Sequence, residues 1–127
     1  MEKLFIEERE DSPSILFDKT IGLIEIKGKS LPEDAIVFYQ KLHESVKQYV
    51  NSPLQKTTVN FKLEYLNSSS AKKILEIITL LEPLPHKGYV VNLNWYYKEE
   101  DDDMLEEGEE FSRMTDLHVN IEKIIKA

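Results

Sequence analysis

Residues 57–81 read TTVNFKLEYLNSSSAKKILEIITLL, a stretch in which a predicted strand passes directly into a predicted helix. Val59, Phe61 and Leu63 alternate with polar residues, which is the two-residue period of a strand with one buried face. After Asn67 and three serines, apolar residues return at three- and four-residue spacing and predict a helix over Ser69–Leu81. The residues expected to face the core from this helix are Ala71, Ile74, Leu75, Ile78 and Leu81.

Strands are predicted on both sides of this stretch as well as within it. They cover Lys3–Glu7, Ser14–Asp18, Ile21–Lys27, Thr57–Glu64, Tyr89–Tyr97 and Val119–Ile125. A short helix is the alternative for the last of these segments. The first three follow one another, and residues 18–20 form a hairpin-sized link between the second and the third. Later strands alternate with helices, in the order β-β-β-α-β-α-β-α-β. This order predicts one α/β domain over residues 1–127, with a mixed β-sheet, three helices and right-handed crossovers.

The other two helices flank the central stretch. The first is predicted to begin at Ser30-Leu31-Pro32-Glu33, a Ser-x-x-Glu capping box with proline in the first turn. Its expected apolar face consists of Ala35, Phe38, Leu42, Val46, Tyr49 and Val50. The third helix is predicted over Asp103–Thr115, and its expected buried residues are Met104, Leu105, Phe111 and Met114. Gly108 inside it costs about 1 kcal/mol relative to alanine, which indicates close packing or a helix break.

Charge and cysteine content exclude several classes of function. The net charge is −8, and residues 99–110, EEDDDMLEEGEE, hold nine of the 24 acidic side chains and no basic one. A chain without a basic stripe is a poor candidate for binding nucleic acid or an anionic membrane. The absence of cysteine excludes disulfides and thiolate metal sites. With no signal peptide and no membrane-spanning run, we expect a cytoplasmic protein that binds other proteins and inserts into no membrane.

The acidic segment, residues 99–110, has three interpretations. It can be a metal site, a surface that docks a protein partner, or the solvated start of a helix, where acidic side chains complement the helix dipole. An EF-hand loop requires glycine at its sixth position, whereas Gly108 is the tenth residue of this segment. His43, His86 and His118 are scattered without metal-ligand spacing, and no known catalytic motif is present. The expectation is therefore a protein that is not an enzyme and has no cofactor.

The three serines also have two interpretations. Asn67 or Ser68 can cap the following helix by accepting a hydrogen bond from a free backbone N–H. A helix that begins at a strand end is also suited to a phosphate, because free N–H groups and the positive end of the helix dipole meet there. Phosphorylation would add about −1.5 to −2 charges, enough to create or abolish a docking surface. Lys72 and Lys73 lie one turn away and can face such a phosphate.

Three longer stretches resemble a known family. They are SLPEDAIVFY at residues 30–39, FKLEYLNSSSAKKIL at 61–75 and VNLNWYYKEEDDDMLEEGEEF at 91–111, and they are similar to the SiaC-type regulatory phosphoproteins of bacteria. The resemblance implies a STAS-like fold and a reversible phosphorylation switch. In that family a SiaB-type kinase phosphorylates a hydroxyl residue just after Leu-Asn, and a SiaA-type PP2C phosphatase removes the phosphate. The unphosphorylated form binds and stimulates a GGDEF diguanylate cyclase, which controls cyclic-di-GMP and biofilm formation.

Carried over by position, the resemblance makes Ser68 the phosphate acceptor, because it is the first residue after Leu66-Asn67. Ser69 and Ser70 are chemically similar neighbours and remain alternative acceptors. The partner-binding residues it implies are Asn67, Ser68, Ser69, Lys72 and Lys73. Two other functions stay open: a STAS-type antagonist that binds an anti-sigma kinase, and a small enzyme or divalent-metal-binding protein that uses the acidic segment.

Overall fold

The computed structural model describes residues 3–124, which form one mixed β-sheet with three α-helices packed against it. The strands lie in the sheet in the order in which they occur in the chain: β1 (Lys3–Ile6), β2 (Ser14–Asp18), β3 (Leu23–Ser30), β4 (Lys56–Leu66), β5 (Val90–Lys98) and β6 (Val119–Ile124). The β1–β2 and β2–β3 pairs are antiparallel, whereas the three later pairs are parallel. The predicted mixed sheet is confirmed.

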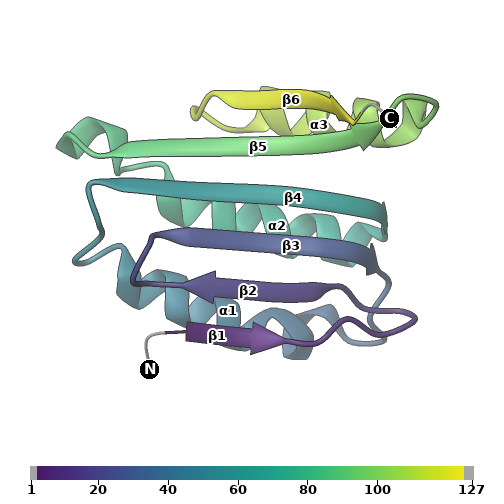
Figure 1. Cartoon of the computed structure of the whole chain (residues 1–127), viewed down its shortest axis with the longest axis horizontal. Helices are drawn as coiled ribbons and strands as arrows, with labels where there is room; N and C mark the ends of the chain where they lie inside the picture. Colours follow the sequence, from purple (N-terminus) through teal and green to yellow (C-terminus); the bar gives the residue numbers. More distant parts are fainter. Residues whose placement is uncertain (1–2, 125–127) are drawn as a thin grey trace.

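Each parallel pair of strands is joined through a helix. The helices are α1 (Ala35–Tyr49), α2 (Ser68–Leu81) and α3 (Asp102–Met114), and a 3-10 turn, η1 (Pro85–Lys87), follows α2. The strand order advances by one position at every crossover, so crossovers of one hand place all these helices on the same face. Figure 1 shows α1, α2 and α3 behind the sheet, with no described helix in front of it. The element order predicted from the sequence is confirmed.

The core lies between the helices and the sheet. The alternation predicted for β4 is confirmed, because Val59, Phe61 and Leu63 are all buried against the helices. In α2 the residues Ile74, Ile77, Ile78 and Leu81 carry the packing, while Ala71 and Leu75 are only half-buried. Met114 differs from its prediction as a buried residue, because it is 53% exposed at the last turn of α3.

The start of α1 also differs from its prediction. Ser30 is the last residue of β3 and does not cap the helix. Asp34 is the N-cap, and its Oδ1 accepts hydrogen bonds from the backbone N–H groups of Ile36 and Val37 at 3.1 and 3.2 Å. The capping-box prediction is therefore wrong, because the Ser30 hydroxyl is buried and bonded to side chains of two helices. The start of β3 is shifted as well, since Gly22 makes a turn with φ of 66° and leaves Ile21 exposed.

Gly108 marks close packing, and α3 continues through it. A Cβ built on Gly108 would lie 2.4 Å from Cδ1 of Trp95, closer than real Cβ atoms come to a neighbour. The Trp95 ring is buried and its Nε1 donates a 2.9 Å hydrogen bond to the backbone carbonyl of Met104. Glycine at this position therefore allows α3 to lie directly on the indole ring of β5.

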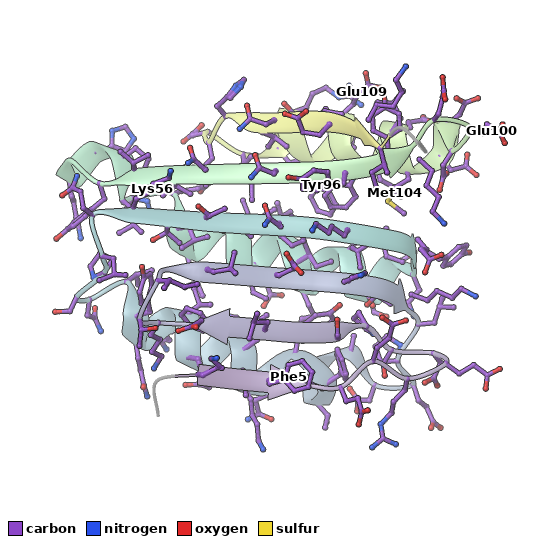
Figure 2. The ribbon with its side chains drawn as sticks, viewed as in Figure 1. Phe5, Lys56, Tyr96, Glu100, Met104 and Glu109 are labelled. Carbon is purple, nitrogen blue, oxygen red and sulfur yellow. The ribbon has the colours of Figure 1, made fainter. Side chains whose placement is uncertain are left out.

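The opposite face of the sheet carries polar side chains and is covered by none of the described helices (Figure 2). Asn60, Asn94 and Asn120 lie side by side on β4, β5 and β6 and form a ladder. Asn94 donates to Asn60 at 2.9 Å, and Asn120 donates to Asn94 at 3.0 Å. Phe5 and Tyr96 project from the same face. The ladder pairs these amide side chains with one another by hydrogen bonds on a surface that faces water.

Candidate functional site

The carboxyl ends of the parallel strands bring the starts of all three helices to one edge of the sheet (Figure 1). In open α/β sheets this edge is where functional sites collect. It holds the three serines at the start of α2 and the acidic residues at the start of α3. The serine stretch and the acidic segment, separated in the sequence, therefore lie at the same end of the molecule.

Asn67, and not Ser68, caps α2. Its backbone is extended, and its Oδ1 accepts a 2.8 Å hydrogen bond from the backbone N–H of Ser70. The Ser69 hydroxyl also donates to Oδ1 of Asn67, at 3.3 Å. Asn67 thus satisfies the free N–H that the capping interpretation required, and leaves the Ser68 hydroxyl outside the cap. We call residues 67–70 the acceptor turn.

The three serines lie in different environments. Ser68 and Ser69 are exposed, whereas Ser70 is 0% exposed. The Ser70 hydroxyl accepts a 2.8 Å hydrogen bond from the Ser30 hydroxyl and lies 3.2 Å from the Ser30 carbonyl, to which it donates. The Ser30 hydroxyl is also 2.5 Å from the Tyr39 hydroxyl. Burial raises the pKa of Tyr39 to about 12, although its hydrogen bonds oppose that rise.

Sequence reasoning did not identify Ser30 and Tyr39 as neighbours of the acceptor turn. Tyr39 directly follows Phe38 in the sequence but was not predicted to lie on the apolar face of α1, whereas in the structure it is fully buried. Of the three serines in the run, only Ser70 is buried, and the sequence gives no sign of its hydroxyl partner on β3. Ser30 and Ser70 are 40 residues apart, so their contact depends on the pairing of β3 with β4.

The two predicted lysines do not act together. Lys72 is exposed and lines a groove between α2 and α3. Lys73 is partly buried and its Nζ pairs with the Glu76 carboxylate at 3.0 Å. Glu76 also lies 3.9 Å from His43 of α1, which places this pair on the α1 side of α2. Of the two lysines, Lys72 remains available to a group bound at the acceptor turn.

The acidic segment lines a groove of ≈ 580 Å³ between α3 and the end of β4. The residues that line it are Glu64, Tyr65, Leu66, Asp101, Asp103, Met104, Glu106, Glu107 and Glu110. Partial burial, together with the charges of Glu110, Glu106 and Asp103, raises the pKa of Glu107. Asp101 is the N-cap of α3 and accepts from the backbone N–H of Met104 at 3.0 Å. These carboxylates therefore repel one another, which favours a cationic neighbour.

A metal-binding arrangement is absent from the part of the chain that the structure describes. Among residues 3–124, no three His, Asp or Glu side chains come together in a way that could hold a metal ion.

A second groove of ≈ 200 Å³ adjoins the first through Glu107 and Glu110. Its floor is apolar and consists of Ala71 and Leu75 from α2 with Phe111 and Met114 from α3. Both grooves are suited to contact with another protein.

An exposed serine turn beside charged and apolar grooves, on a small α/β domain, is the arrangement expected of a regulatory domain. The chain belongs to the SiaC family, because the family described as SiaC family regulatory phosphoprotein matches residues 6–124. The family resemblance drawn from residues 30–39, 61–75 and 91–111 is therefore confirmed.

Similar proteins come from Pseudomonas aeruginosa. An uncharacterized protein of strain UCBPP-PA14 is 29% identical over 111 residues, which is 87% of this chain and 88% of that protein. The chain is also similar to SiaC in the crystal structure of diguanylate cyclase SiaD in complex with its activator SiaC. That match has a TM-score of 0.89 and 26% identity, and covers 95% of this chain and 99% of the other. The apo-SiaC crystal structure matches with a TM-score of 0.88 and 27% identity, over 96% and 99% of the two chains.

These likenesses confirm the predicted α/β fold and the regulatory class of the protein. As for membranes, no helix within residues 3–124 combines the length and the apolar character that a bilayer span requires.

Proposed function

We propose that this protein is a non-enzymatic regulatory phosphoprotein that acts as a protein–protein switch in the cytoplasm. In its unphosphorylated form it binds and stimulates a GGDEF diguanylate cyclase, and phosphorylation of Ser68 releases the cyclase. Family membership supports the regulatory role, and the similar SiaC of Pseudomonas aeruginosa is the activator of the cyclase SiaD. A SiaB-type kinase and a SiaA-type PP2C phosphatase are the enzymes that set the phosphorylation state.

The observation that carries this proposal is the contrast between Ser68 and Ser70. Ser68 is exposed at the first position of α2, and its hydroxyl makes no hydrogen bond within residues 3–124. Ser70 is fully buried, so a kinase could reach it only after the first turn of α2 had unfolded. Ser69 is exposed, but its hydroxyl donates to Asn67. Among the three serines, Ser68 is the one that the folded protein presents freely.

A phosphate on Ser68 has a physical reason to act as a switch. At the first position of α2 it meets the positive end of the helix dipole, which stabilises the modified helix start. Lys72 is four residues further along the same helical face and can pair with the phosphate. The added charge of about −2 must also be desolvated when a partner covers this surface, and that cost opposes binding. Asn67, Ser68, Ser69 and Lys72 are accordingly proposed as interface residues.

The test compares Ser68→Ala with Ser68→Asp in binding to the diguanylate cyclase of the same organism. Ser68→Ala should bind like the unmodified protein and keep this affinity after treatment with kinase and ATP. Ser68→Asp should bind about tenfold more weakly or worse, which corresponds to about 1.4 kcal/mol. Ser52→Asp is the matched control, because Ser52 is exposed just beyond the C-terminal end of α1, far from the acceptor turn at the helix starts.

Equal affinity of the two Ser68 variants for the cyclase would contradict the switch. Capture of an anti-sigma kinase in place of a cyclase would favour the antagonist function over the proposed one. Calorimetry with Ca²⁺, Mg²⁺ and Mn²⁺ tests the remaining alternative, because specific binding at micromolar concentration would indicate a metal-binding role for the acidic segment.

A further inference from the structure

We propose that Ser30, Tyr39 and Ser70 form a hydroxyl clamp whose function is to direct phosphorylation to Ser68. The three side chains are positioning residues: they touch neither ATP nor the transferred phosphate, and they hold the acceptor turn in one geometry. This inference rests on the proposed function, since it assumes that a serine of the acceptor turn is phosphorylated.

The clamp holds the acceptor turn at both ends. At the first end, the backbone N–H of Asn67 donates to the Ser30 carbonyl at 3.0 Å. At the other end, the Ser70 hydroxyl donates to the same carbonyl at 3.2 Å and accepts from the Ser30 hydroxyl at 2.8 Å. Only Ser68 and Ser69 lie between these two fixed points. Tyr39 completes the clamp from α1 through its 2.5 Å contact with the Ser30 hydroxyl.

Burying hydroxyl groups in a core lowers stability unless each of them finds a hydrogen-bond partner. Each of the three clamp residues is 0% exposed. A buried hydroxyl without a partner costs about 1–3 kcal/mol, so apolar residues of similar size would pack there at lower risk. A fully paired hydroxyl network instead fixes distances and directions, which apolar contacts do not. The clamp joins β3, α1 and α2 at the point where α2 begins. It therefore fixes the position and direction of the first turn of α2.

The direction of this turn matters because adjacent serines are chemically alike and differ only in the direction in which their side chains point. Successive residues of a helix point about 100° apart. Ser68 is two turns before Leu75, which lines the groove against α3, so Ser68 faces the α3 side. Ser69 is two turns before Glu76, which lies beside His43 of α1, so Ser69 faces the α1 side. A frayed or rotated first turn would therefore offer a kinase Ser69 or Ser70 in place of Ser68.

The experiment follows phosphorylation of the full chain by the SiaB-type kinase of the same organism with ATP, and locates the phosphate by mass spectrometry. Tyr39→Phe removes one hydroxyl of the clamp and keeps the ring. Tyr49→Phe is the matched control, because Tyr49 lies on the same helix and its buried hydroxyl is 2.8 Å from that of Thr57. Tyr49 is at the far end of α1, more than two turns from the clamp.

With the wild type and Tyr49→Phe we expect phosphate on Ser68 alone. With Tyr39→Phe we expect kcat/KM at Ser68 to fall about tenfold, the factor that corresponds to the loss of one hydrogen bond, and phosphate to appear on Ser69. Ser70→Ala should show the same redistribution. A merely structural role would lower the stability of Tyr39→Phe and Tyr49→Phe alike and leave the site distribution unchanged.

Hydrogen exchange on the unphosphorylated proteins gives a second readout that needs no kinase. Tyr39→Phe should accelerate exchange of the amides of Ser70 and Ala71, and Tyr49→Phe should not. If Tyr39→Phe matches Tyr49→Phe in phosphorylated site, kcat/KM and exchange, the clamp is refuted while the phosphorylation switch stands. If the wild type accepts no phosphate on any of the three serines, both proposals fall.

Discussion

The contact between α3 and β5 leads to a quantitative prediction for Gly108→Ala. The added Cβ would lie 2.4, 2.8 and 2.9 Å from Cδ1, Nε1 and Cγ of Trp95, all below the 3.0 Å that real Cβ atoms keep. The indole ring is buried and has aromatic neighbours. It packs against Phe61 and Phe111, with ring centroids at 5.5 and 5.0 Å, and its Nε1 donates to the Met104 carbonyl.

Two opposing contributions decide the size of the effect. Alanine in a helix interior is favoured over glycine by about 1 kcal/mol. Overpacking of a tight core costs about 1–3 kcal/mol, and a shift of the ring that breaks its buried hydrogen bond costs about 1 kcal/mol more. Because the ring is enclosed on both sides, the upper part of this range applies. We expect a net destabilisation of about 2–3 kcal/mol, or a fall of about 7–11 °C in the melting temperature.

The assay is chemical and thermal unfolding followed by circular dichroism, with the fluorescence of Trp95 as a second probe, since it is the one tryptophan in the sequence. Ser112→Ala is the control: Ser112 is exposed on α3, so alanine there should change the free energy of unfolding by only a few tenths of a kcal/mol. If Gly108→Ala is as stable as the wild type, and Trp95 fluorescence is unchanged, then α3 does not depend on direct contact between its backbone and the ring.

Three further predictions concern the site. Asn67→Ala removes the acceptor of the Ser70 N–H bond and should lower the free energy of unfolding by about 1 kcal/mol; an unchanged value in urea unfolding would refute the cap. The pKa of Glu107 is raised above its ordinary 4.5, so its contribution to stability is present at acidic pH and is lost as pH rises through that raised pKa. Glu107→Gln should therefore melt at a higher temperature than wild type at pH 7 and at the same temperature near pH 4, whereas a difference that persists at acidic pH would contradict this. The pKa of Tyr39 is about 12 in the folded protein, against 10 ordinarily, so its contribution is complete below pH 10 and is lost as pH rises toward 12. Tyr39→Phe should remove the part of the stability loss at alkaline pH that comes from Tyr39. If the slope of the unfolding free energy against pH is the same in this variant as in the wild type, Tyr39 ionises as readily in the folded protein as in the unfolded chain.

Periodicity was sufficient to predict the central elements. β4 and α2 differ from their predictions by at most two residues at either end, because each has a long apolar pattern that only one period fits. The last strand was predicted as Val119–Ile125 and is observed as Val119–Ile124, while Ile125 lies outside the described residues. Asn67 as a cap was one of two readings that the sequence allowed, and the hydrogen bond to Ser70 decides between them.

Local motifs were misleading where a distant residue decided the outcome. Ser30 fits a capping box, yet it ends β3, because its hydroxyl finds partners in Tyr39 and Ser70. Nothing near Ser30 in the sequence indicates a partner 40 residues away. The role predicted for Lys73 was also affected by a contact, in this case with a residue only three positions away: the structure pairs it with Glu76. The acidic segment was correctly expected at a helix start, but its proximity to the acceptor turn required the sheet order.

The face of the sheet without helices is suited to the attachment of a fluorescent label. Lys27 lies on that face, with an exposed side chain, in the middle of β3. Because the chain has no cysteine, Lys27→Cys would provide a unique thiol for a fluorescent dye. The dye would be attached on the side of the sheet opposite the helices, away from the acceptor turn and from Trp95. Binding and phosphorylation could then be recorded in real time on a single labelled chain.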